Sequence, residues 1–264
     1  MLEIARFEGR HRVRGTAVAT VALGGFALMY VVLFPTFAES FGADIDALLA
    51  AYPEALQKAF GIQTLASMEG FLASELYTFF WMLILGLYFA YGGAALIAAD
   101  VERERMDMLL SLPVSRARVV TEKFASLFVP LIALNVVVPT VVYAGTVAVD
   151  YAVDPVDLFV LHALSIPYLL VFAGVGLVAS VVFDRASVAQ RASLGVLTGL
   201  FFAESLLTDT DYEVVGVVSP SRYLDPNAVL IDSEYALADA AVLAVAALAL
   251  VGLAVVLFRR KDIE

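Results

Sequence analysis

Long apolar runs are the feature that most limits what this chain can fold into. Residues 237–258 consist almost wholly of Ala, Leu and Val, and residues 16–37 are nearly as apolar. A helix of about 20 apolar residues is enough to cross the hydrocarbon core of a bilayer. The whole chain is 62% hydrophobic and 16% charged, whereas soluble domains are roughly 45–50% apolar and about 25% charged. The sequence therefore predicts a membrane protein.

Six apolar segments alternate with polar connections along the chain. We expect an all-α, polytopic membrane protein that forms one membrane domain over residues 1–264, because we find no internal repeat and no low-complexity linker. The apolar part of a signal peptide is only about 7–15 residues long, so we expect the first span to be retained. The predicted spans are residues 16–37, 71–99, 124–149, 158–183, 192–207 and 237–258. The fifth is short for a full crossing.

The basic residues test this division independently, because Lys and Arg concentrate in cytoplasmic loops. If the amino terminus is cytoplasmic, the inner segments 1–15, 100–123, 184–191 and 259–264 hold fourteen of the sixteen basic residues. The outer segments hold only Lys58 and Arg222. We therefore predict a multi-pass protein of the cell membrane with six spans and cytoplasmic amino and carboxyl termini.

Composition excludes several classes of function. The chain has no Cys and two His, which excludes thiolate sites and disfavours a histidine metal site. A net charge of −11 disfavours nucleic acid as a partner, since phosphate binding needs clustered positive charge. The apolar spans make the lipid bilayer the expected surrounding. No metalloprotease, hydrolase, Walker or dinucleotide motif is found. We expect no catalytic residue, metal or cofactor in this chain.

Ionisable groups at membrane depth are costly and are candidates for function. Glu204, near the outer end of the fifth span, either contacts a substrate or ion, or is solvated because the helix ends early. Glu75 and Asp239 lie closer to the ends of their spans. His162 and Asn135 are expected to form hydrogen bonds within the helix bundle rather than to bind a ligand.

The longest charged interruption, residues 100–123, lies between the second and third spans, and we call it the charged segment. Residues 102–112 are predicted to form a helix with Met106, Leu109 and Leu110 near one face. Pro113 disfavours helical geometry at Leu112 and should end that helix. Ser115 is a suitable N-cap for a helix that enters the third span. An apolar set in a water-facing helix favours a docking element over an ordinary charged loop.

At these residues the chain resembles a known family. Residues 102–105 followed by 109–116, LLSLPVSR, resemble the segment E-x-x-x-G-T-x-x-x-L-L-x-x-P-V-S-R of ABC-2 type transporter permeases, including the NosY-like branch. Residues 67–71, 219–223 and 258–262 also resemble family sequences. Met106 and Asp107 stand where the family often has Gly-Thr, so the docking surface differs there.

The resemblance implies a permease subunit of an exporter in which the charged segment contains a coupling helix. It implies two copies of an ATP-binding subunit, which bind the ATP, and a second permease copy or a sister permease. The residues assigned to coupling are Glu102, Glu104, Arg105, Met106, Leu109, Leu110, Leu112, Pro113, Ser115 and Arg116.

Two other functions stay open on the sequence. A gradient-driven secondary transporter would show inverted repeats and broken helices at mid-membrane, and neither is convincing here. A membrane anchor or assembly subunit of a soluble complex would need no central pathway.

Overall fold

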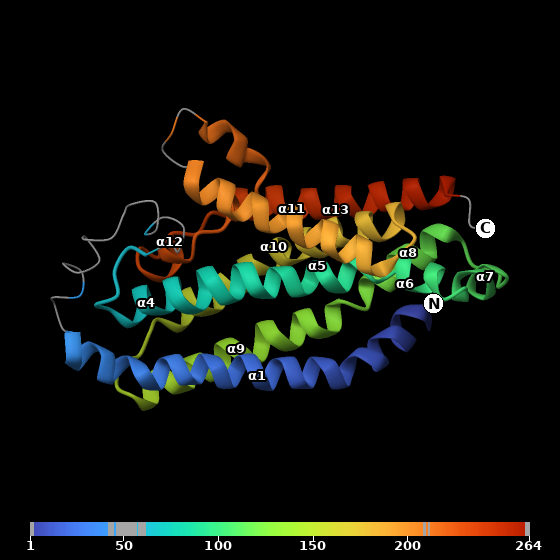
Figure 1. The fold of residues 1–264 in the computed structure, drawn as a ribbon. Coiled ribbons are helices and arrows are strands. Elements are labelled where there is room, and N and C mark those ends of the chain that lie inside the picture. The colour runs from blue at the N-terminus through green and yellow to red at the C-terminus, as the bar shows by residue number, and fades with distance from the viewer. Residues whose placement is uncertain are drawn as a thin grey trace.

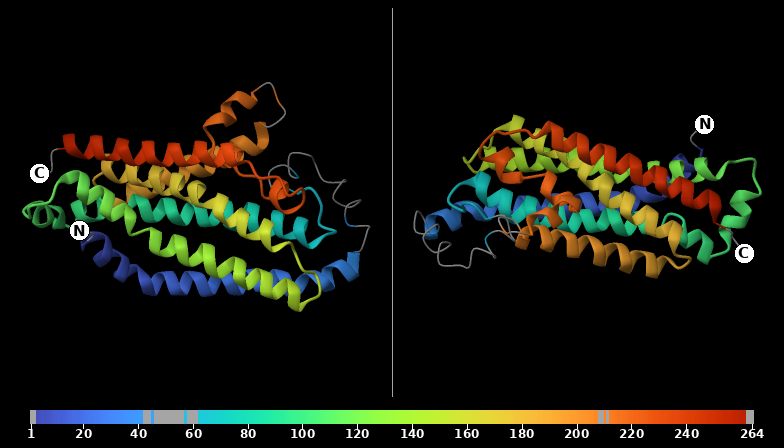
Figure 2. Two further views of the ribbon diagram at one scale, coloured as in Figure 1. Left: turned by 180° about the vertical axis from the view of Figure 1, so that it is seen from behind. Right: turned by 90° about the horizontal axis from the view of Figure 1, so that it is seen from above.

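The computed structural model describes residues 3–41, 45, 57, 62–207, 210 and 212–261, and in these ranges the chain is helical without strands. The long helices run side by side along one axis (Figures 1 and 2). The helices are α1 (Glu3–Phe41), α4 (Met68–Phe71), η1 (Leu72–Leu85), α5 (Gly86–Ala94), α6 (Ala98–Glu102), α7 (Arg105–Leu110), α8 (Arg116–Ala125), α9 (Phe128–Ala148), α10 (Pro155–Val182), α11 (Ala186–Leu207), η2 (Glu213–Val218), η3 (Pro220–Tyr223), α12 (Pro226–Leu230) and α13 (Leu237–Arg260).

Five helices in the described part of the chain are long and apolar enough to cross a membrane. They are Glu3–Ser40, Met68–Ala94, Arg116–Ala148, Pro155–Val182 and Leu237–Arg260. These helices correspond to the first, second, third, fourth and sixth predicted spans. The second, third and fourth predictions extend a few residues past the ends of their helices. The fifth predicted span lies within α11, a helix of 22 residues that is less apolar than the others. The chain is thus a multi-pass membrane protein with five apolar helices and one more polar helix beside them.

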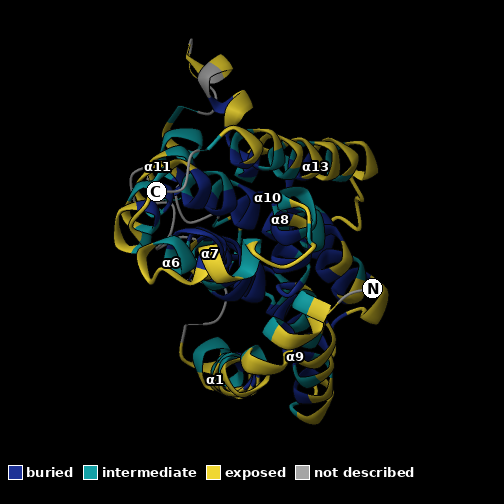
Figure 3. Ribbon diagram, turned by 90° about the vertical axis from the view of Figure 1, so that its right-hand side faces the viewer, coloured by how far each residue is buried: buried dark blue, intermediate teal, exposed yellow. Residues whose placement is uncertain are grey.

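Helix α10 forms the centre of the bundle. It packs against α5, α9, α11 and α13, whereas α1 lies at the periphery and packs mainly on α9. Seen from the end that carries both termini, the outward faces of α1 and α13 are largely exposed (Figure 3). A helix that is apolar on all sides is suited to a fully surrounded position, and α10 buries Tyr168, Leu169 and Val171, which point in different directions around its axis.

Glycines allow α5 and α10 to approach until their backbones touch. A Cβ on Gly93 would lie 2.2 Å from the carbonyl oxygen of Ala173, and a Cβ on Gly176 would lie 2.1 Å from that of Ala90. Neither backbone atom can move out of the way independently. Close backbone approach at small residues is a main source of helix association in lipid, because apolar side chains gain little by moving from lipid to a helix contact. These two glycines therefore fix the central helix pair.

The second span is wound as a π-helix over the 14 residues of η1. Thr78 Oγ1 also donates to the carbonyl of Ala73, five residues earlier, at 2.9 Å. The span begins at α4, where the Ser67 side chain accepts from the Gly70 amide, and continues into α5. π-Helical turns are rare, are mostly confined to one turn, and are frequent at functional sites. The sequence pattern had predicted an ordinary helix here.

The glycine contact leads to a stability prediction. Gly176→Ala should lower the free energy of unfolding by about 1–3 kcal/mol, because overpacking a tight contact forces the helices apart. Gly252→Ala is the matched control: it lies in α13 with no atom within 4 Å of the added methyl group, and Ala favours a helix over Gly. Thermal unfolding of both variants in detergent tests this, and equal midpoints would contradict it.

Candidate functional site

The charged segment lies at the end of the bundle that carries both chain termini (Figures 1 and 3). The helix predicted over 102–112 is divided into α6 and α7, and Glu104 between them adopts a left-handed conformation with φ of 55°. The stop before Pro113 is confirmed, since α7 ends at Leu110. The N-cap is confirmed as well, because the Ser115 side chain accepts from the Arg118 amide at 3.2 Å.

A lysine with little solvent contact is at the centre of this end. Lys123 is 3% exposed, and its Nζ lies 2.6 Å from Glu8 Oε1 and 2.5 Å from Asp100 Oδ2. Asp100 also pairs with Arg105 at 2.5 Å. Buried charges are tolerated when they are paired and hydrogen-bonded. This network joins α1, α6 and α8, and the sequence analysis did not assign Glu8 or Lys123 to any site.

The neighbouring Glu122 caps the first helix. Its Oε2 accepts from the amides of Ile4 at 2.9 Å and Ala5 at 3.3 Å, and its Oε1 accepts from Arg118 Nε at 2.6 Å. The first amides of a helix lack partners within the helix and carry positive partial charge, so a carboxylate there is stabilising. A carboxylate 117 residues later in the chain thus holds the start of α1.

Two predicted coupling residues hold other helix ends. Glu102 accepts from the Ala186 amide at the start of α11 at 3.1 Å. Arg116 donates to the carbonyl oxygens of Phe258, at 2.9 Å, and Lys261 at the end of α13. Its guanidinium also lies 5.6 Å above the Phe258 ring. The charged segment is therefore fastened to α1, α11 and α13 from within.

The remaining coupling residues divide into buried and exposed groups. Met106 is 1% exposed and belongs to the hydrophobic core, so its predicted place on a water-facing surface is wrong. Leu109 and Leu110 are half-buried against the core, and Pro113 is exposed. The apolar side chains that face outward are Met108, 66% exposed, and Leu112, 56% exposed. Arg103, Glu104 and Asp107 are exposed beside them. Two exposed apolar side chains therefore lie among exposed charged side chains on this surface.

The intramembrane polar residues form hydrogen bonds, as predicted. Asn135 Nδ2 donates to the Leu131 carbonyl at 2.9 Å, and its Oδ1 accepts from Ser165 Oγ at 3.0 Å. His162 Nε2 lies 3.1 Å from the Tyr77 hydroxyl, and the His162 ring meets Trp81 edge-on at 4.3 Å between centroids. These contacts join α9, η1 and α10 in the bundle interior.

Glu204 lies near the other end of the bundle. Helix α11 continues to Leu207, so the alternative in which the helix ends before Glu204 is wrong. Glu204 Oε1 lies 3.7 Å from a guanidinium nitrogen of Arg222, and the carboxylate packs directly on Gly216. Through these contacts with Gly216 and Arg222, Glu204 joins α11 to η2 and η3.

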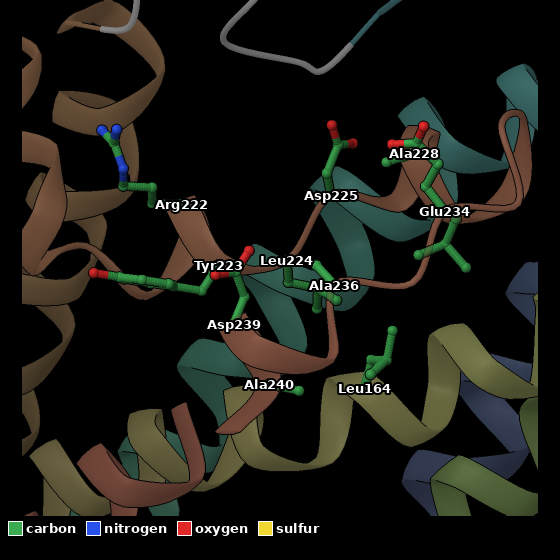
Figure 4. Close-up of a pocket in the computed structure, with 11 residues that line it drawn as sticks. Leu164, Arg222, Tyr223, Leu224, Asp225, Ala228, Glu234, Ala236, Asp239 and Ala240 are labelled. Atoms are coloured by element: carbon green, nitrogen blue, oxygen red, sulfur yellow. The ribbon is translucent and has the colours of Figure 1, made fainter. Parts of the chain in front are cut away.

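The polar connection at this end is held by hydrogen bonds and encloses little space. Tyr235 donates to Asp157 Oδ1 at 2.5 Å, and this bond to a carboxylate raises the pKa of the Tyr235 phenol. A cavity of about 60 Å³ lies beside η3 and α12, which is room for a few waters. Figure 4 shows Arg222 pointing away from Asp225 and Glu234. Within the described residues, no group of three His, Asp or Glu could hold a metal ion.

Comparison with protein families decides what kind of membrane protein this is. The family model described as "ABC-2 family transporter protein" matches residues 3–263. The chain belongs to the ABC-2 transporter family. Members of this permease family lack ATPase domains and work with ATP-binding subunits, so the chain is the membrane component of such a transporter. No curated protein matches the chain.

The buried network of this ABC-2 permease leads to a second stability prediction. Lys123→Met should lower the free energy of unfolding by about 3 kcal/mol, because it leaves Glu8 and Asp100 without their shared cation. Arg185→Met, at an exposed basic residue of the same end, should change it little. Chemical unfolding in detergent compares the two variants, and an equal effect of both would refute the role of the buried lysine.

Proposed function

We propose that this chain is the permease subunit of an ATP-driven exporter of the cell membrane, with six spans and with both termini in the cytoplasm. It would act as one membrane domain, and its coupling segment supports membership of the NosY-like branch. The charged segment would receive the ATP-binding subunit, and the closure of two such subunits would push on it and move the third span. ATP would be bound entirely in those subunits.

Charge supports this orientation. The described parts of the four predicted inner segments lie together at the end with the termini (Figure 1), and Arg222 lies at the other end with η3. Fourteen of sixteen basic residues at one end is the asymmetry expected of a cytoplasmic face. Helix α11 supports the sixth crossing, because its 22 residues extend about 33 Å at 1.5 Å per residue, enough for a hydrocarbon core of about 30 Å.

The single observation that carries the coupling proposal is the surface formed by Met108 and Leu112. These apolar side chains face outward from the charged segment, while Glu102, Arg116 and Glu122 fasten the same segment to three helix ends. A force applied to this surface would reach α1, α11 and α13 as well as the third span. A surface loop without such bonds would move by itself when pushed and would transmit little of the force to the helices.

The outward face of α11 supports pairing with a second permease. Gly195 and Gly199 are four residues apart on this face, and a Cβ on either would meet no atom within 4 Å. Val196 beside them is 56% exposed. In membranes the pattern G-x-x-x-G marks faces where two helices approach closely. We propose that two permease copies meet along α11 and pair with two ATP-binding subunits.

The coupling surface leads to a functional prediction. Met108→Asp and Leu112→Asp should each weaken the binding of the ATP-binding subunit at least about tenfold, because a carboxylate would be buried in an apolar contact. Each should therefore also abolish the stimulation of ATP hydrolysis in the complex. Val214→Asp, at an apolar residue of the other end that is 75% exposed, is the control. Subunit affinity and ATPase rate are measured on the purified proteins. Wild-type values for both segment variants would exclude this docking surface.

The α11 face leads to an assembly prediction. Gly199→Leu should convert a paired permease into single chains in detergent, because the added side chain would hold the two helices apart. Gly252→Leu adds the same side chain to an open position of α13 and should leave the mass unchanged. Light scattering during size-exclusion chromatography reports the mass, and a paired Gly199→Leu variant would refute pairing through this face.

A further inference from the structure

A groove of about 460 Å³ lies between α1 and the second span, away from the coupling segment and from the α11 face. Ligand sites commonly have volumes of about 300–1,000 Å³, so this groove is large enough for a small organic molecule. Its α1 side includes Tyr30, Leu33 and Phe37, and its other side includes Leu65, Phe71 and Glu75. Since α1 lies at the periphery of the bundle, the groove lies towards the outside of the bundle rather than at its centre.

Aromatic rings form much of this lining. The Phe71 ring lies 5.7 Å from that of Tyr30 and 5.3 Å from that of Phe37, measured between centroids. Both pairs are tilted rather than stacked, so ring edges and faces are presented in several directions. Faces of aromatic rings attract cations, most strongly where water is excluded.

Glu75 is the one carboxylate among the described residues that line the groove. It is half-buried near the start of the π-helix, and it makes no hydrogen bond or ion pair with the described residues. Lys123 and Arg222 already pair with acidic groups elsewhere. A half-buried carboxylate near the end of a span, with no counter-charge among the described residues, is costly to keep and is a candidate for binding a mobile partner.

The surroundings of Glu75 restrict what that partner can be. A metal ion requires several oxygen or nitrogen ligands around it, whereas the rest of this lining is mostly apolar and aromatic. An anion would be repelled by the carboxylate. A cation with apolar substituents satisfies both features, because its charge meets Glu75 while its body meets the rings.

We propose that the groove between α1 and η1 binds a lipophilic organic cation taken from the bilayer, with Glu75 as the counter-charge and Tyr30, Phe37 and Phe71 as the aromatic wall. This inference rests on the proposed transport function and gives it a substrate class. In the proposed orientation the groove is a cargo-binding site towards the outer face of the membrane, and Glu75 selects by charge.

Two ions of nearly the same shape and opposite charge test this directly. Tetraphenylphosphonium should bind the purified full-length permease in detergent, and tetraphenylborate should not. Glu75→Gln removes the charge and keeps the shape, and should weaken tetraphenylphosphonium binding at least about tenfold. Glu69→Gln is the matched control, because it removes a carboxylate from α4 that does not line the groove. Tyr30→Leu should also weaken binding, by about tenfold.

Each outcome decides the proposal. Equal binding of the two ions, unchanged affinity in Glu75→Gln, or an equal loss in Glu69→Gln would overturn it. Binding is measured without the ATP-binding subunit, so it does not depend on coupling. If the assembled complex hydrolyses ATP in a Met108-dependent manner but tetraphenylphosphonium fails to bind, this inference falls and the proposed function stands. If the cation binds while the Met108→Asp and Leu112→Asp variants behave as wild type, the coupling surface is at fault instead.

Discussion

The pairing of one buried lysine with two carboxylates is the interaction on which the terminus-bearing end depends. Lys123 cannot leave its site without stranding Glu8 and Asp100, and ions removed from water are stable only with such partners. The adjacent Glu122 closes the amino end of α1, while Arg116 closes the carboxyl end of α13. Helix α8 therefore holds helices from the beginning, middle and end of the chain in fixed positions relative to one another.

The bundle is not equally tight throughout. Helices α5 and α10 touch through their backbones at Gly93 and Gly176, and buried hydrogen bonds join α9 and η1 to α10. In contrast, α1 meets the second span through aromatic side chains such as Phe71 and leaves a groove beside Glu75. Helix α1 is held by α8 and α9 but meets η1 over a small area, so the bundle combines a rigid centre with one place where a ligand can enter between helices.

Sequence reasoning predicted the features that follow from local rules. Apolar length located the five helices that could cross a membrane, Pro113 ended α7, and Ser115 capped α8. It failed where contacts between distant residues decide. Periodicity grouped Met106 with Leu109 and Leu110 near one face of a single docking helix, but the helix is interrupted at Glu104 and Met106 is buried in the core. The roles of Glu102 and Glu122 at helix starts also depend on partners more than 80 residues away, and no local pattern reports them.

The π-helical winding of η1 changes how much membrane the second span can cross. As an α-helix, the 27 residues Met68–Ala94 would extend about 40 Å at 1.5 Å per residue, well beyond a hydrocarbon core of about 30 Å. A wider helix uses more residues in each turn and advances less per residue, so this apolar run becomes shorter along the membrane normal. A span that is too long must otherwise tilt, kink or thicken the bilayer around it. The winding of η1 thus reduces the hydrophobic mismatch of this span.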